Sequence, residues 1–332
     1  MRTLTTSEKS CYQLCPRKHH YKYDMLMRSV WVSESLRFGS LWHRGMQAWW
    51  EGAHAELTPL ESAVAAMRKV DPRDGVPDPV QLIICEELLA LYDARWSSEP
   101  YEVLEVEKVF ETPMINPETG VPSRTYVAGG KMDAIVRDVR DFRMLVVEHK
   151  TSSEDISPGS EYWQRLTLNS QVSDYFAGGR SLGYDIEACL YDVVLKPKLR
   201  PLLATPLESR KYTKATKTEP SRLYAAQREN DETLDEFRLR LREHLLQNPE
   251  QWFVRGIVAR TEEDERDAAF DSWNIGKQIA ESARLNRHPR NPNSCNVYHR
   301  MCEFFGVCTR TASLEDETLF RVAETAHEEL AT

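Results

Sequence analysis

The chain has 332 residues, of which 41% are hydrophobic and 29% charged, a balance typical of a globular protein with its own core. It has no run of about 18 apolar residues and no apolar segment near its start, which excludes a membrane span and a secretory signal. We therefore expect an intracellular, cytoplasmic protein without membrane contact.

The seven cysteines and the distribution of charge narrow the class of function. In a reducing compartment an odd number of cysteines favours metal or redox chemistry over disulfides. The net charge of −9 argues against nucleic-acid binding, but basic residues gather in 1–50 and 195–217. Such local basic zones can bind a phosphate backbone, although solvated surface explains them equally well.

The first half of the chain changes its hydrophobic period from helical to strand-like. Helices are predicted at 34–50, 60–70 and 80–96, the last two separated by the turn-rich segment 71–75. Strands are predicted at 103–110, 126–137 and 144–148, with a turn at 116–120. The closely spaced strands indicate a β-meander.

The second half alternates helices and strands. The pattern predicts a helix at 161–183 ending at Gly183, a strand at 186–195, a charged helix or helix pair at 218–248, a strand at 252–254 and a helix at 262–286. A cysteine-rich coil follows, and 313–332 reads as a weak amphipathic helix or a frayed tail. The order predicts an α/β fold, with a central mixed sheet flanked by helices and an added helical region, in one domain over 1–310 with an acidic tail over 311–332.

The most informative residues are the acids and the lysine in the predicted strands. Asp133 lies in one strand, and Glu148-His149-Lys150 lies in the next. Alternation places Glu148 and Lys150 on one face and turns the His149 side chain away. Two carboxylates suit Mg²⁺ or Mn²⁺, and a lysine can orient water or offset developing charge, as phosphodiester hydrolysis requires.

These residues belong to an ordered series of motifs: Gly39-x-x-x-His43, then Glu107, then Gly130-Lys131-Met132-Asp133, then Glu148-His149-Lys150, and finally Gln171-x-x-x-Tyr175. Each motif is loose by itself, but five in this order are specific. The series resembles the PD-(D/E)XK nuclease superfamily, and within it the RecB-like branch. The resemblance implies a restriction-endonuclease-like core.

The resemblance also implies roles for the motif residues. Asp133 and Glu148 would be the main metal ligands, joined by His43 and by the backbone carbonyl of His149. Lys150 would be catalytic. Gln171 and Tyr175 would position DNA or the attacking water, and Glu107 would be an outer or substrate-side acid, with Glu105 as its near neighbour.

A second group of residues predicts a metal clasp. Cys295, Cys302 and Cys308 are spaced C-x6-C-x5-C near the end of the chain, and Cys15, followed by Pro-Arg-Lys, can supply a fourth ligand. The arrangement resembles iron–sulfur RecB-like nucleases, in which one early cysteine joins three late ones. The resemblance implies a 4Fe-4S cluster that holds the two ends of the domain together.

Several alternatives to this clasp remain open from the residues alone. Zinc fits the same cysteines, with His19 or His299 as substitute ligands, and Cys11 is an alternative to Cys15. Cys85 and Cys189 lie in apolar patterns and read as buried core thiols.

Basic residues near the cysteines suit a nucleic-acid strand. Arg17 and Lys18 lie among aromatic residues, a mixture that suits single-stranded DNA but also suits ordinary packing around the cysteines. The basic stretch around Lys211 and Lys214 is either a second DNA contact or a mobile loop.

Together these features predict a Mg²⁺- or Mn²⁺-dependent deoxyribonuclease, more an exonuclease than an endonuclease, acting on DNA ends or single strands. Repair, recombination and phage or mobile-element DNA processing are suitable settings. The chain lacks the G-x-x-x-x-G-K-[ST] phosphate loop, so a helicase or recombination protein would be a separate partner. The alternative is a non-catalytic iron–sulfur subunit that binds DNA within a larger complex.

Overall fold

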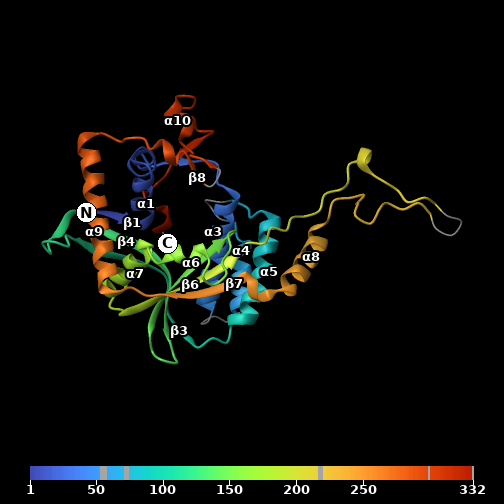
Figure 1. The fold of residues 1–332 in the computed structure, drawn as a ribbon, viewed down its shortest axis with the longest axis horizontal. Helices are drawn as coiled ribbons and strands as arrows, with labels where there is room; N and C mark the ends of the chain where they lie inside the picture. Colours follow the sequence, from blue (N-terminus) through green and yellow to red (C-terminus); the bar gives the residue numbers. More distant parts are fainter. Residues whose placement is uncertain (53–57, 71–74, 216–219, 298–299, 331–332) are drawn as a thin grey trace.

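A computed structural model describes residues 1–52, 58–70, 75–215, 220–297 and 300–330 (Figure 1). Its centre is a six-stranded mixed sheet in the order β1-β4-β5-β6-β7, with β3 also paired to β4. The strands are β1 (Arg2–Thr5), β3 (Tyr101–Ile115), β4 (Pro122–Asp138), β5 (Met144–Ser152), β6 (Ile186–Leu195) and β7 (Phe253–Val258). Strands β3, β4 and β5 form the expected antiparallel meander, whereas β5 and β6 run parallel.

Alternation along β5 divides its side chains between two cores. Leu145 and Val147 pack into one cluster, and Val146 packs into another on the opposite face. Both faces of the strand are therefore buried, which explains why its sequence is a continuous apolar run. Beyond Val147, the same alternation sorts Glu148 and Lys150 to the face of Val146, and His149 to the face of Val147.

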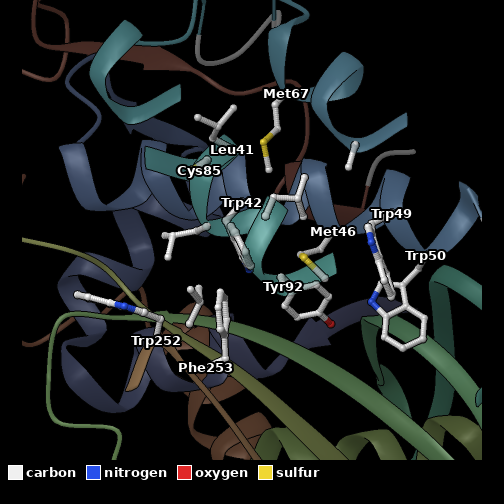
Figure 2. Close-up of a cluster of buried hydrophobic side chains, with 14 of the residues drawn as sticks. Leu41, Trp42, Met46, Trp49, Trp50, Met67, Cys85, Tyr92, Trp252 and Phe253 are labelled. Carbon is white, nitrogen blue, oxygen red and sulfur yellow. The ribbon is translucent and has the colours of Figure 1, made fainter. Parts of the chain in front are cut away.

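One face of the sheet is covered by four helices that supply the larger core. They are α3 (Glu34–Glu51), α4 (Pro59–Arg68), α5 (Pro79–Trp96) and α8 (Leu234–Gln247). Figure 2 shows Trp42 and Tyr92 in this core, together with Met46 and with Phe253 from the sheet. Trp42 is 1% exposed, so the apolar face of α3 is held tightly against the strands.

The opposite face carries α6 (Glu161–Leu166) and α7 (Ser170–Ser181), and α9 (Glu262–Leu285) lies beside α7 (Figure 1). Phe110 of β3 packs against Tyr175 of α7, with ring centroids 6.2 Å apart. Gly178 lies so close to Phe110 that a Cβ there would fall 2.3 Å from its ring. This glycine lets α7 settle onto β3 and sets the height of the helix above the sheet.

Both ends of the chain contribute to a smaller lobe above the sheet. Its helices and strands are α1 (Thr6–Leu14), α2 (Pro16–His19), a π-helix (His20–Asp24), β2 (Met27–Ser29), β8 (Asn296–Val297), β9 (Arg300–Met301), α10 (Phe305–Thr309) and β10 (Phe320–Val322). Short 3-10 turns are formed by Leu207–Ser209, Pro249–Trp252, Pro292–Ser294 and Glu328–Leu330. Strand β10 pairs antiparallel with β2, so the end of the chain is fastened to its beginning.

The structure corrects three predicted elements. The helix expected at 161–183 is two helices, because Asn169 caps a new one by accepting a hydrogen bond from the backbone N–H of Gln171. In the region expected to be helical at 218–248, the helix among the described residues is 234–247, which starts at a capping box formed by Thr233 and Glu236. The described part of 313–332 holds β10 and a 3-10 turn, not an amphipathic helix or a frayed tail.

The remaining predicted helices and strands are confirmed, with ends shifted by a few residues. Strand β1 and helix α1 were not predicted. Most of the turn at 71–75 lies outside the described residues, as does His299. None of the described helices has the length and apolar character needed to cross a membrane.

Candidate active site

Two carboxylates meet where β4 and β5 run side by side. Asp133 and Glu148 each lie one residue beyond the pair Ala134–Val147 in this antiparallel ladder. The backbone N–H of His149 donates a hydrogen bond of 2.7 Å to Oδ2 of Asp133. The two acids expected from the sequence are thus brought together by strand pairing.

Three side chains donate to the carboxylate of Glu148, which is 2% exposed. Lys150 donates to Oε1, Tyr175 donates to Oε2, and Gln171 Nε2 reaches Oε1 at 3.1 Å. Gln171 and Tyr175 also contact each other at 2.6 Å. Because Gln171 and Tyr175 are four residues apart on α7, both face the strand end, and the network joins the helix to the sheet.

His43 approaches the site from α3. Its Nδ1 lies 3.5 Å from Oδ2 of Asp133. Burial lowers the pKa of His43, but its contacts with Asp133 and the charge of Glu148 together outweigh burial, so the pKa is raised overall. Burial likewise raises the pKa of Asp133, but His43 and other nearby cationic groups hold that pKa well below its usual range.

The His149 side chain points away from the other site residues, as alternation predicts. Its Nδ1 lies 3.3 Å from Oδ2 of Asp192, at ion-pair distance but without hydrogen-bond alignment. Tyr92 donates to the same oxygen of Asp192, and Arg255 approaches it at 3.2 Å. The sequence analysis missed this buried group, although Asp192 is the one charged residue between Ala188 and Leu195, and that was an available signal.

Glu107 faces the acidic centre from β3. It lies between Val106 and Lys108, which pair with residues of β4 on either side of Asp133. It forms an ion pair with Lys131, and burial raises the pKa of its carboxyl, with Asp133 adding to the rise. Glu105, the neighbouring acid, instead accepts hydrogen bonds from Tyr184 and Lys108, each at 3.0 Å.

The donor set of this site fits a hard divalent cation. Asp133 and Glu148 come from facing positions at the end of the β4–β5 ladder, and the imidazole Nδ1 of His43 lies 3.5 Å from Oδ2 of Asp133. Mg²⁺ and Mn²⁺ prefer such oxygen-rich sites, which they complete with water. Lys150 lies next to the carboxylates, where its ammonium group can stabilise the negative charge of a phosphate.

The four predicted cysteine ligands line one cavity in the smaller lobe. Cys15, Cys295, Cys302 and Cys308 surround a space of about 580 Å³. Cys11, the alternative ligand, is buried, and burial raises the pKa of its thiol to about 11. Among the described residues that line the cavity Cys11 does not appear, so the geometry favours Cys15.

Arg17 and Lys18 also line this cavity, and both have partners within the protein. Arg17 Nε donates to the carbonyl oxygen of His288 at 2.7 Å, and Lys18 forms a 3.2 Å ion pair with Glu303. These contacts hold α2 against the late cysteine segment. A DNA contact by Arg17 and Lys18 stays a prediction.

His20, Asp24 and His288 place possible ligand atoms within 4.8 Å of one another, a group that the sequence analysis missed. The two imidazoles stack face to face, with centroids 3.8 Å apart and planes 13° from parallel. The lone pair of an imidazole nitrogen lies in the ring plane, so these two rings do not converge on one ion. His20 instead interacts with Asp24 at 3.1 Å.

Two solved structures that resemble this chain are distant from it. One is a provisionally assigned exonuclease from Eubacterium rectale, with 11% identity and a TM-score of 0.45 over 95% of this chain and 90% of that one. Another is the protein SSO0001, with 15% identity and a TM-score of 0.27 over 74% of this chain and 76% of that one. The curated proteins include no match.

The comparison with protein families gives a match over almost the whole chain. The family model for the PD-(D/E)XK nuclease superfamily matches residues 3–309, which include the acidic site and all four cysteines of the cavity. The chain therefore belongs to the PD-(D/E)XK nuclease superfamily.

Proposed function

We propose that this nuclease hydrolyses DNA phosphodiester bonds with Mg²⁺ or Mn²⁺ bound between Asp133 and Glu148. The observation that carries the proposal is the pairing of these two carboxylates with Lys150 at one end of the β4–β5 ladder. His43 and the carbonyl oxygen of His149 complete the proposed ligand set. When bound, the cation polarises the phosphate and activates water.

Each remaining side chain then has a task that its contacts support. Lys150 places a positive charge beside the phosphate that is to be cut, which favours the charge that develops during hydrolysis. Gln171 and Tyr175 hold the Glu148 carboxylate in one orientation through their hydrogen bonds. We assign Glu107 to the substrate side of Asp133, where its ion pair with Lys131 would hold it.

We also propose that the substrate is a DNA end or a single strand, cut exonucleolytically, as in the RecB-like branch. The order of motifs from Gly39 to Tyr175 supports this finer assignment. The experiment is cleavage of DNA labelled at either end, single- or double-stranded, with Mg²⁺, Mn²⁺ or EDTA. We expect metal-dependent shortening from one end. DNA binding without cleavage under every condition would favour the non-catalytic subunit instead.

A 4Fe-4S cluster is proposed for the cavity formed by Cys15, Cys295, Cys302 and Cys308. What supports the proposal is that all four cysteines line one cavity and that their order along the chain resembles that of the iron–sulfur RecB-like nucleases. Zinc bound to the same four thiolates is the alternative. When bound, the cluster supplies a structural link between the two ends of the chain.

Metal analysis of protein purified without oxygen tests this assignment. We expect about four iron atoms per chain, lost in Cys302→Ser and retained in the matched core variant Cys85→Ser. The iron-free variant should also unfold more readily. About one zinc per chain and no iron would refute the cluster.

A further inference from the structure

Residues 196–233, here called the basic arm, leave the sheet after β6 and end where α8 begins. Figure 1 shows this segment, coloured yellow to orange, extending well beyond the other elements. Its two legs are paired: Tyr212 bridges to Leu223, Thr213 N–H donates to Arg222 at 2.8 Å, and Tyr224 N–H donates to Lys211 at 3.0 Å. The described part of the arm is thus an ordered antiparallel projection.

The arm is positively charged on a chain whose net charge is −9. It carries nine Lys and Arg residues against five Asp and Glu residues. Two of the acids are used at its root, where Asp231 accepts from Ala204 N–H and Glu232 pairs with Arg240.

The outer cations of the arm include Lys211, Lys214 and Arg222. Within the described parts of the chain, no acidic side chain pairs with Lys211, Lys214 or Arg222. Unpaired cations on a projecting segment attract an anionic partner over a distance set by the salt concentration.

Aromatic side chains accompany these cations. Tyr212 is 49% exposed and Tyr224 is 48% exposed. The bridge and the hydrogen bond described above place both tyrosines in the same stretch of the arm as Lys211 and Arg222. Cations that hold phosphates, next to exposed rings that stack on bases, are what single-stranded nucleic-acid sites use.

The root of the arm lies at the catalytic edge of the sheet. Strands β5 and β6 run parallel with Lys150 opposite Val193 and Ser152 opposite Leu195. Lys196 N–H, the first of the arm, donates to the carbonyl oxygen of Ser152 at 2.7 Å. The arm therefore begins three residues beyond the level of Lys150.

A cavity of about 480 Å³ lies between this root and the site. It is lined by Phe38, Tyr162 and Lys196, among others. The Lys196 ammonium lies 4.5 Å from the centroid of the Phe38 ring. Lys196 also forms a 3.0 Å ion pair with Glu34, so the root contributes a hollow next to the end of β5, and the exposed cations and rings lie further out on the arm.

We propose that the basic arm is a second DNA-binding site, which holds the strand flanking the bond that is cut. This inference rests on the proposed nuclease function and adds an extended substrate contact to it. From Lys196 to Tyr212 the extended chain can reach at most about 55 Å. Substrates of about six nucleotides should fill the catalytic site alone, whereas substrates of about forty should also engage the arm.

The test compares two triple variants with the same loss of charge. The arm variant is Lys211→Ala/Lys214→Ala/Arg222→Ala. The control is Arg124→Ala/Lys277→Ala/Arg287→Ala, in which three exposed cations outside the arm are removed. Binding of a forty-nucleotide single strand is measured across salt concentrations, and kcat/KM is measured on both substrate lengths with Mg²⁺.

We expect the arm variant to bind the long strand at least tenfold more weakly at about 0.1 M salt. The slope of log K against log salt concentration should fall in magnitude by about 2. Its kcat/KM on the short substrate should stay within twofold of wild type. Tyr212→Ala/Tyr224→Ala should weaken binding while preserving the slope. The control triple should change neither quantity.

Equal binding and slope in the two triple variants would overturn the proposal, and would leave an acidic protein as the partner of the arm. This outcome is separate from failure of the nuclease assignment. If wild type cleaves no DNA, the binding measurement still decides whether the arm holds a nucleic-acid strand.

Discussion

At the scale of single residues, the carboxylate of Glu148 organises the site. A buried carboxylate is costly unless charge and hydrogen bonds compensate it, and Lys150, Gln171 and Tyr175 all supply donors. Burial lowers the pKa of Lys150, but the charge and hydrogen bond of Glu148, together with the charge of Asp133, outweigh burial, so the lysine keeps its proton to a higher pH than usual. Groups proposed to act on the substrate therefore also fix the proposed metal ligand.

Tyr175→Phe tests this arrangement, because it removes only the hydroxyl that donates to Glu148. We expect kcat to fall about tenfold or more, and the free energy of unfolding to fall by about 1–3 kcal/mol because a buried acceptor loses its partner. The matched control is Tyr184→Phe, whose hydroxyl bonds Glu105 outside the site. Equal kcat values for the two variants would contradict the role given to Tyr175.

The residues of the site could be predicted from the sequence because each motif is local and the motifs come in a fixed order. The environment of the His149 side chain could not be predicted from the sequence. Its neighbours Tyr92, Asp192 and Arg255 come from three distant elements, and no local pattern predicts that they meet. Strand alternation did predict that the His149 side chain turns away from Glu148.

At the scale of elements, α7 determines whether Gln171 and Tyr175 reach the strand end. Its start is set by Asn169 and its height by Gly178 against Phe110. Periodicity predicted helix throughout 161–183, because a short break leaves the apolar spacing nearly intact. The break matters for function, since it lets α7 begin immediately before Gln171.

Gly178→Ala should destabilise the protein by about 1–3 kcal/mol, because the added methyl collides with a rigid aromatic ring. The control is Gly39→Ala on α3, where a Cβ would make an ordinary 3.8 Å contact with Thr151. There, alanine should raise stability by up to about 1 kcal/mol. Chemical denaturation checks both variants, and a stabilised Gly178→Ala would show that α7 does not depend on close approach to β3.

At the scale of the whole molecule, the two ends of the chain hold each other. Strand β10 pairs with β2, and His327 lies 3.1 Å from a carboxylate oxygen of Glu8, which is fully buried. The resemblance of the cysteine pattern to that of iron–sulfur nucleases implied that the ends would meet. The sequence did not predict the strand pairing, because a three-residue strand has too few positions to show a period.

The contact between His327 and Glu8 predicts a dependence of stability on pH. Burial lowers the pKa of His327, but Glu329 and Glu8 raise it to about 9, from an ordinary value of 6.5. Because the pKa of His327 is higher in the folded state than in the unfolded state, protonation of His327 stabilises the fold. This stabilisation is complete at pH values below the unfolded pKa and is lost as the pH rises through about 9.

His327→Gln should therefore lower the free energy of unfolding by about 1–3 kcal/mol at about pH 6. The loss should be much smaller once the pH is above the folded-state pKa of His327. Urea denaturation of both proteins across this range measures the difference. A difference that does not change with pH would show that His327 contributes only packing.

The most direct test of the account is the cleavage rate of Lys150→Ala beside the matched surface variant Lys277→Ala. Both would be purified without oxygen and assayed on end-labelled DNA with Mg²⁺ or Mn²⁺. We predict that Lys150→Ala still folds and binds DNA but loses at least a hundredfold in kcat (about 2.7 kcal/mol), while Lys277→Ala cleaves like wild type. Cleavage by Lys150→Ala at the wild-type rate would contradict the active site described above.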